Sequence, residues 1–307
     1  MIKPTLLRTL TLREPSRPGR PAHISAASGL ARVGEHLYIV ADDENHVAVF
    51  PAEGDEPGTL KRIFAGQLPI ETEARKRNKA DVECITRLPA SSVYPQGALL
   101  ILGSCSRRQR CSGVLLGLDA AAQLDGTRAE VDLGELHDAF ETRFGRLNIE
   151  GALVCGGELL LLQRGNKGDR RNARIHMRLG AAVESLVSKQ RLGIGPVTRI
   201  EEVQLGTIGE VPLSFTDGAA LPDGRMLFTA VAEDTADSYA DGACHGAVIG
   251  IMGGDGRVER VEPIEGAFKV EGIDATLENG IVRALLVTDA DDAQIPASLL
   301  TCEFTSA

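Results

Sequence analysis

Four short phrases in the sequence place an acidic residue in an apolar frame, a setting in which carboxylates bind metal ions or transfer protons. The phrases are Asp81-Val-Glu83-Cys-Ile85, Asn148-Ile-Glu150-Gly-Ala152, Phe215-Thr-Asp217-Gly-Ala219 and Val270-Glu271-Gly-Ile273-Asp274. If the chain brings these phrases around one axis, their carboxylates cannot all stay ionised without a nearby cation. Carboxylate and amide oxygens are natural ligands of Ca²⁺ and Mg²⁺. The sequence therefore predicts an oxygen cage for one of these ions, formed by Glu83, Asn148, Glu150, Asp217 and Glu271.

Basic side chains near these phrases could hold the negative charge of a substrate. Arg107, Arg110 and Arg164 follow two strongly apolar segments, and Lys269 precedes the last acidic phrase. Guanidinium and ammonium groups bind phosphate and carboxylate groups well. We therefore expect these four residues to bind a small anionic molecule.

A hydrolase is the enzyme class that such a site would support. A bound divalent ion would polarise an ester, lactone or phosphoester oxygen and lower the pKa of a bound water. A channel carboxylate, Glu150 or Glu271, or the loop residue His245 would then take the proton. The alternative is a non-catalytic protein that binds a small ligand or a protein partner. In that case the acidic residues would bond backbone N–H groups of a neighbouring repeat, and the basic residues would form structural ion pairs.

The acidic phrases belong to a longer repeat, which indicates how the fold positions them. Ser28 in a degenerate first copy and the later Glu83, Glu150, Asp217 and Glu271 are separated by 55, 67, 67 and 54 residues. Each copy continues into a strongly apolar segment, and these segments are 37–40, 98–102, 159–162, 226–229 and 284–287. Short runs of Val, Ile and Leu between turn residues are typical of strands. The pattern predicts an all-β, five-bladed β-propeller with four-stranded blades, whose first strands line a central channel.

Two features of the repeat concern its ends and its insertions. The fifth copy stops after a third strand, whereas residues 5–12 alternate like an outer strand, so we expect this N-terminal strand to close the ring. Segments 135–144 and 181–189 have apolar residues spaced by three and four, which predicts short helical insertions. Segment 71–79 could form a third helix, but its charge favours a solvated loop. Residues 1–307 would form a single propeller domain.

Polar residues that follow the second strand of each copy should reach the same mouth of the channel as the acidic phrases. These residues are Asp42, Asp43, Ser104, Gln163, Asn166, Glu233, Asp234, Asp289, Asp291 and Asp292. Lys79, before the first complete acidic phrase, adds a cation. The sequence therefore predicts a strongly charged mouth.

These repeats resemble bacterial β-propellers, a loose group that includes phytase-like esterase propellers and an uncharacterised family of cytosolic propellers. The resemblance covers nearly the whole chain and rests on residues 81–83, 147–152, 163–166, 230–233 with 239–242, 269–273 and 288–292. The Glu-Gly pairs are also similar to those of gluconolactonase and paraoxonase-type propellers, in which this glutamate is a divalent-metal ligand. That similarity implies that Glu150 and Glu271 are metal ligands.

Composition limits the partners of the chain. Its 307 residues include 43 acidic and 33 basic ones, for a formal net charge of −10. An acidic chain is a poor general binder of nucleic-acid phosphates or of an anionic membrane surface. No apolar run approaches the length that spans a bilayer, and the N-terminus lacks the apolar core of a signal peptide. The six cysteines show no CxxC pair, so we expect a cytoplasmic protein with reduced cysteines.

Overall fold

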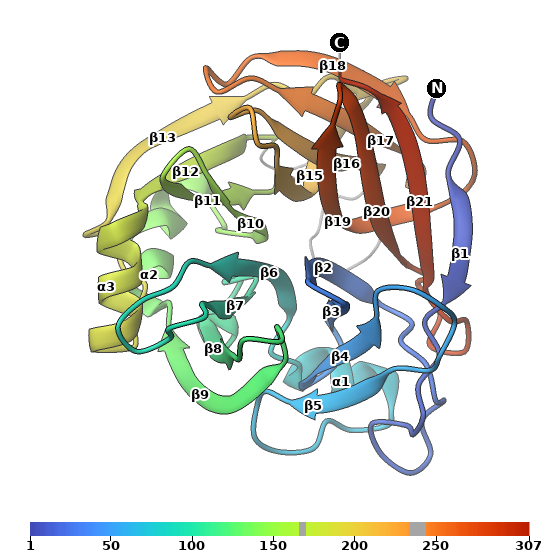
Figure 1. Cartoon of the computed structure of the whole chain (residues 1–307). Coiled ribbons are helices and arrows are strands. Elements are labelled where there is room, and N and C mark those ends of the chain that lie inside the picture. The colour runs from blue at the N-terminus through green and yellow to red at the C-terminus, as the bar shows by residue number, and fades with distance from the viewer. Residues whose placement is uncertain (166–169, 234–243, 307) are drawn as a thin grey trace.

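Five antiparallel sheets surround a central axis in the computed structural model, which describes residues 1–165, 170–233 and 244–306 (Figure 1). Four sheets have four strands, and the sheet of the fourth blade has five. Within a blade, strands that are consecutive in sequence pair as neighbours. The predicted five-bladed β-propeller is confirmed.

The strands of each blade follow one another outward from the axis. The first blade contains β2 (Ala27–Val33), β3 (His36–Ala41), β4 (His46–Pro51) and β5 (Thr59–Arg62). The second contains β6 (Val82–Leu88), β7 (Ala98–Gly103), β8 (Ser112–Leu118) and β9 (Leu124–Asp132). The third contains β10 (Ile149–Cys155), β11 (Glu158–Gln163), β12 (Asn172–Arg178) and β13 (Val197–Val203). The fourth contains the short β14 (Thr207–Ile208), then β15 (Val211–Ala220), β16 (Met226–Glu233), β17 (Cys244–Met252) and β18 (Val258–Pro263). The fifth contains β19 (Lys269–Glu278), β20 (Ile281–Asp289) and β21 (Ser298–Thr305).

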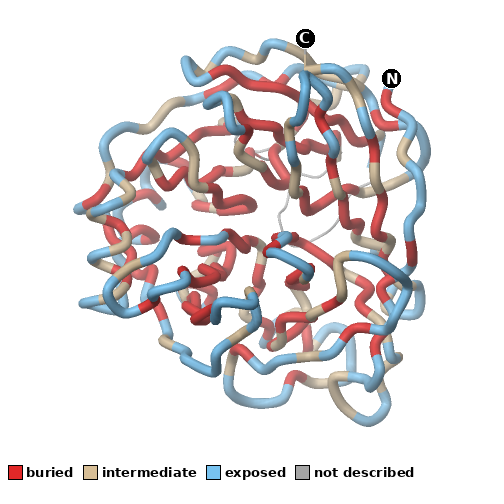
Figure 2. The backbone as a smooth tube through the Cα atoms, in the orientation of Figure 1, coloured by how far each residue is buried: buried red, intermediate tan, exposed pale blue. Residues whose placement is uncertain are grey.

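Burial explains the composition of these strands. The second strands are apolar because adjacent blades cover both of their faces, and every residue of β7 is buried. Outer strands such as β5 and β9 are mostly exposed. In Figure 2, buried segments accordingly gather in the inner parts of the blades and exposed segments on the rim. Apolar side chains pack between blades, as where Tyr38 and Val40 join Leu99 and Ile101 in one core cluster, and this packing fixes the inner strands.

The N-terminal strand closes the ring, as predicted. Strand β1 (Thr5–Thr9) pairs antiparallel with β21, so both ends of the chain share one sheet (Figure 1). Leu10, directly after β1, is fully buried in the same core cluster as Leu299 of β21. Closure gives the fifth blade four strands and covers what would be an open edge of β21.

Three α-helices lie outside the sheets in the described part of the chain. Helices α2 (Gly134–Phe144) and α3 (Leu179–Lys189) are the two predicted insertions, and they lie at one edge of the ring in Figure 1. Helix α1 (Thr72–Asn78) occupies the segment that its charge assigned to a solvated loop. That expectation was wrong because Arg75 is buried, with ion pairs to Glu44 at 2.6 Å and Asp43 at 3.2 Å. No helix of the described residues is long and apolar enough to cross a membrane.

A bulge in every inner strand marks the position that repeats around the axis. The pairing between each inner strand and its neighbour skips one residue, and the skipped residues are Ser28, Glu83, Glu150, Thr216 and Glu271. Such a bulge re-aims one side chain relative to the rest of its strand. In the fourth blade, Thr216 and not Asp217 therefore occupies the repeated position. Asp217 was expected at the repeated position because it is the acidic residue of that phrase.

Candidate functional site

A pocket of about 230 Å³ opens at the mouth of the propeller, where the inner strands begin. Four bulge residues line it, namely Ser28, Glu83, Glu150 and Glu271. The residues two positions earlier form a second set around the same pocket: Ala26, Asp81, Asn148, Ser214 and Lys269. Seven basic and ten acidic side chains line the pocket in total, an excess of three negative charges when all are ionised. The predicted charged mouth is present.

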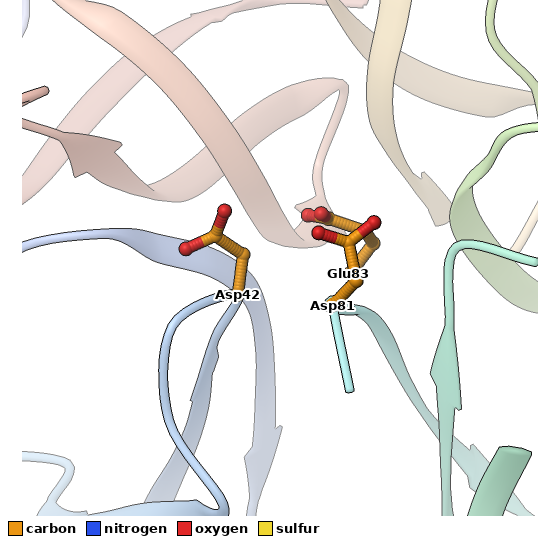
Figure 3. A group of neighbouring side chains, drawn as sticks. All are labelled: Asp42, Asp81 and Glu83. Atoms are coloured by element: carbon orange, nitrogen blue, oxygen red, sulfur yellow. The ribbon is translucent and has the colours of Figure 1, made fainter. Parts of the chain in front are cut away.

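Three carboxylates meet on one side of this pocket. Asp42 follows β3, Asp81 precedes β6, and Glu83 is the bulge residue of β6. One oxygen from each lies within 4.8 Å of the others, and Figure 3 shows Asp81 and Glu83 next to each other with Asp42 beside them on a separate segment. Asp81 has a backbone φ of 58°, a left-handed conformation that Asp tolerates better than most residues. Carboxylate groups at this spacing form a donor set for a divalent cation.

Two basic side chains hold Asp81 in place. Lys79 lies 2.9 Å from Asp81 Oδ1 and also pairs with Asp42, while Arg110 Nη1 donates to Asp81 Oδ2 at 2.6 Å. The Ser104 hydroxyl donates to the same Oδ2 at 2.5 Å. Burial alone would raise the pKa of Asp81, but Lys79 and Arg110 outweigh it and lower the pKa. Asp81 is therefore an ionised, rigidly placed carboxylate.

Glu83 differs from Asp81 because its carboxylate has no hydrogen bond or ion pair with any described residue. Burial raises the pKa of Glu83 well above its usual value, and the negative charges of Glu150, Asp81 and Asp42 raise it further. Lys79 opposes this shift without cancelling it. The pocket therefore contains one carboxylate whose negative charge lacks a partner among the described residues.

A second cluster of carboxylates lies across the pocket and shares two cations. Arg164 contacts Glu150 at 3.1 Å, Glu233 at 2.7 Å and Glu271 at 3.8 Å. Burial raises the pKa of Glu271 to about 8, although Lys269 and Arg164 oppose the shift. Burial likewise raises the pKa of Glu150, against the effect of Arg164. Two of these glutamates therefore bind a proton more tightly than an exposed glutamate does.

Lys269 is the second cation of this cluster, and it contacts four carboxylates. Its Nζ lies 3.4 Å from Glu233, 3.5 Å from Glu271, 3.3 Å from Asp289 and 2.9 Å from Asp291. Burial disfavours the ammonium form, but these neighbours outweigh it and raise the pKa of Lys269 well above its usual value. Lys269 is thus a charged, fully engaged residue of the pocket wall.

The residue after each bulge lies where neighbouring inner strands approach closely. A Cβ atom added to Gly272 would lie 2.9 Å from Cα of Gly29, and one on Gly151 would lie 3.1 Å from Cα of Asp217. Asp217 accepts hydrogen bonds from the backbone N–H groups of Gly218 at 2.7 Å and Ile273 at 3.0 Å. In this layer the inner strands of neighbouring blades therefore lie in close contact.

The sequence matches a family of unknown function, DUF6929, over residues 23–304. The chain belongs to this family. In this DUF6929 protein, the matched region contains every inner strand and every pocket-lining residue except Arg20. No curated protein matches the sequence.

Solved structures with a similar fold give this DUF6929 protein no activity. One is a hypothetical protein from Leishmania major, with 9% identity and a TM-score of 0.49, covering 98% of this chain and 91% of that chain. Another is glutaminyl cyclase from Myxococcus xanthus, with 10% identity and a TM-score of 0.49, covering 99% and 98% of the two chains. A third is MPT-4, a mannose phosphorylase from Leishmania mexicana, with 11% identity and a TM-score of 0.47, covering 96% and 86%. Similarities this low carry no argument about activity.

The structure of the DUF6929 protein brings most of the predicted site residues to one pocket. Those that line it are Glu83, Asn148, Glu150, Glu271, Arg110, Arg164 and Lys269. The described lining omits Asp217, which lies in the layer beneath, and Arg107, which is half-buried next to the short helix 108–110. His245 is exposed and lines a neighbouring pocket instead. Asn166, Asp234 and residues 239–242 lie outside the described residues. The chemical roles of all these residues stay predictions.

Two site features were not assigned from the sequence. Asp42 and Asp81 were placed near the mouth but not in the metal-ligand set, because the ligand set was drawn from the repeated position alone. The position of Asp42 and Asp81 beside strand ends at the mouth was the sequence feature that could have indicated them as ligands. The ion pairs of Arg75 with Asp43 and Glu44 had no sequence signal, since α1 and the loop after β3 are more than 25 residues apart.

Proposed function

We propose that the central pocket binds one divalent cation, Ca²⁺ or Mg²⁺, and is the active site of a hydrolase. Its substrate would be a small anionic ester, lactone or phosphoester. One observation carries the proposal: the carboxylate of Glu83, which has no partner among the described residues, lies within 4.8 Å of the carboxylates of Asp42 and Asp81. A half-buried negative charge without a partner is unfavourable among other carboxylates, and a cation is its natural complement.

The donor atoms and the charge of the pocket support this ion. Asp42, Asp81 and Glu83 supply hard carboxylate oxygens, which Ca²⁺ and Mg²⁺ prefer. Lys79 already pairs with Asp42 and Asp81, so a bound ion would compete with its ammonium group. Glu150 of the originally predicted cage is engaged by Arg164 and by the Asn148 amide, which donates to it at 2.5 Å. The ion would therefore lie nearer Glu83 than Glu150.

The metal would also explain how an acidic pocket could accept an anion. Arg110, Arg164 and Lys269 each contact carboxylates, so their charges are already balanced. A divalent ion would offset most of the three excess negative charges and would supply the positive charge that an anionic substrate needs.

The pocket residues would handle the proton. A bound divalent ion supplies polarisation of the substrate oxygen and a more acidic water. Glu271, whose pKa burial raises to about 8, can exchange a proton at its carboxylate near neutral pH. Arg164 holds Glu150, Glu233 and Glu271 in fixed positions and limits the negative charge that builds up when a proton leaves. Glu271 would thus be the proton-transfer group of the proposed site.

The test begins with the metal content of protein purified without chelator and with melting curves in EDTA, Ca²⁺ and Mg²⁺. We expect a near-stoichiometric ion, or a rise in melting temperature with one of the two ions. Asp42→Asn should weaken the binding of that ion at least tenfold. Asp55 is an exposed loop residue in the same blade, and Asp55→Asn should leave the affinity for the ion unchanged. A screen of 4-nitrophenyl esters, small lactones and 4-nitrophenyl phosphate should then show EDTA-sensitive turnover. Absence of any bound ion and of any shift in melting temperature would refute the metal site.

A non-catalytic binding protein is the second candidate, and the ion pairs of the pocket favour it. Arg164 and Lys269 between them contact five carboxylates without any ligand. Such a network can hold blades in register as a purely structural device. In that case Asp42→Asn would lower the melting temperature equally with and without metal, and no substrate of the screen would be hydrolysed.

A further inference from the structure

A second pocket of about 550 Å³, called the side pocket here, adjoins the central pocket on the mouth face. It is formed by residues 244–246 at the start of β17, residues 266–269 before and at the start of β19, and residues 288–291, 295, 296 and 298 from the end of β20 to the start of β21. Three residues, Lys269, Asp289 and Asp291, line both pockets. The two pockets therefore adjoin at these three residues. The volume is in the range of small-molecule sites.

Apolar side chains form part of the lining of the side pocket. Phe268 is half-buried and packs against the core of the fourth and fifth blades, with its ring over Gly266. Ile295 is 51% exposed, which makes it one of the few exposed large apolar residues in the described part of the chain. Pro296 continues this surface. Apolar and aromatic lining with a few polar groups is typical of small-molecule pockets.

The charges around the side pocket exclude one class of apolar ligand. Lys269 is the single Lys or Arg among its described lining residues, and four carboxylates already contact it. Asp289 and Asp291 add negative charge to the shared wall. A carboxylate or sulfonate on the apolar group would therefore meet repulsion without a free cation. An uncharged group meets no such penalty.

We propose that the side pocket binds an uncharged aryl or acyl group of a ligand whose polar end lies in the central pocket. The position of the polar end rests on the proposed function, whereas the binding of the apolar group rests on the side pocket alone. For a hydrolase, this defines the substrate as an ester with a sizeable uncharged group beside the scissile bond.

A neutral fluorescent probe tests the binding of the apolar group. N-phenyl-1-naphthylamine is titrated into the full chain at pH 8 in EDTA, so that the result does not depend on the metal. We expect saturable binding, at least tenfold weaker binding to Ile295→Asp, and less than a twofold change for Ile281→Asp. Ile281 is the matched control because it is 40% exposed at the opposite end of the same blade. The anionic probe 1-anilinonaphthalene-8-sulfonate should bind at least tenfold more weakly than the neutral probe.

Each outcome of this titration decides the proposal. Absence of saturable binding, equal loss in both variants, or equal affinity for the anionic and neutral probes would overturn it. Both substituted residues are exposed, so melting curves of the variants should match that of the original chain within a few degrees.

A kinetic comparison tests the link between the two pockets. Hydrolysis of 4-nitrophenyl octanoate and 4-nitrophenyl acetate releases 4-nitrophenolate and the matching acid by addition of water. Ile295→Asp should lower the octanoate to acetate ratio of kcat/KM at least tenfold, and Ile281→Asp should leave it unchanged. An unchanged ratio in Ile295→Asp would refute the shared ligand. No hydrolysis of either ester, together with retained probe binding, would refute the shared ligand as an ester substrate and leave the side pocket established.

Discussion

The unpaired carboxylate of Glu83 gives the sharpest prediction, because two opposite effects follow from one substitution. Glu83→Gln keeps the size of the side chain and removes its negative charge. Without metal, the charge is unfavourable, since burial and the neighbouring carboxylates raise the pKa of Glu83 well above its usual value. With metal, the same charge would be a ligand. The variant should therefore be more stable than the original chain in EDTA and should lose the stabilisation given by the ion.

The magnitude follows from the geometry of the cluster. Carboxylate oxygens within 4.8 Å of one another repel by about 3 kcal/mol per ionised pair at an effective dielectric constant of about 20. Lys79 offsets part of this repulsion, and protonation of Glu83 relieves another part. We expect Glu83→Gln to raise the free energy of unfolding in EDTA by about 1–3 kcal/mol, or roughly 2–5 °C in melting temperature. An ion at a hundred times its dissociation constant should stabilise the original chain by about 2.7 kcal/mol and the variant hardly at all.

Calorimetric melting curves at pH 7.5 in EDTA, Ca²⁺ and Mg²⁺ measure both effects. The control is Glu278→Gln, at the far end of β19, whose side chain is 66% exposed and which should change neither quantity. A lower melting temperature of Glu83→Gln in EDTA would show that the charge is structurally needed. An ion-induced rise equal to that of the original chain would show that Glu83 is not a ligand. Either result would refute the reasoning.

Three further predictions concern residues of the inner strands β10 and β19. Lys269→Met should lower the free energy of unfolding by about 3–5 kcal/mol in urea titrations, because it leaves buried carboxylates without their cation. The control Lys61→Met, on an exposed strand, should change the free energy of unfolding little. Equal effects of the two substitutions would contradict the role of burial. Burial raises the pKa of Asp274 from 3.8 to about 6, so the folded state binds this proton more tightly than the unfolded chain, and stability falls as the pH rises from about 4 to 6. Asp274→Asn should therefore match the original chain at pH 3 and exceed its stability at pH 7.5, and a variant that is less stable at pH 7.5 would reverse the predicted sign. Gly151→Ala should lower the free energy of unfolding by about 1–3 kcal/mol, because the added Cβ meets side-chain atoms at 2.9 Å. The control Gly195→Ala, whose Cβ would have no atom within 4 Å, should leave the free energy of unfolding unchanged. An unchanged free energy of unfolding in Gly151→Ala would show that the inner strands can separate.

Much of the fold could be predicted because blades leave a local signal. The second strands of the first four blades are buried on both faces, so they are continuously apolar and stand out in the sequence. The unpaired strand at 5–12 and the missing fourth strand of the last repeat together predicted the closure by β1. Helix α1 was harder because the burial of Arg75, its one buried residue, depends on ion pairs with residues of another loop. The local charge of this segment predicted exposure to solvent. The ion pairs with residues distant in sequence offset the free-energy cost of burying Arg75.

The candidate site was predictable in kind but not in its membership. Acidic residues at the repeated positions indicated a charged mouth, and most of the selected residues line it. The position of a bulge decides which residue of a phrase occupies the repeated place, and in the fourth blade that residue is Thr216. A shift of one residue moved Asp217 out of the pocket and into backbone hydrogen bonds. Such a shift cannot be read from residue types, because it depends on strand pairing.

The sequence by itself determined the number of blades, the apolar second strands, the ring closure and an acidic centre, because each of these is a pattern along the chain. Only the tertiary structure decided which charges are balanced. Arg164 and Lys269 meet carboxylates from three blades or loops, whereas Glu83 pairs with no cation among the described residues. Coulomb interactions and desolvation depend on distances of a few ångströms between residues far apart in sequence. The charge pattern of the pocket, and with it the proposed metal site, therefore emerges only when the five blades are assembled.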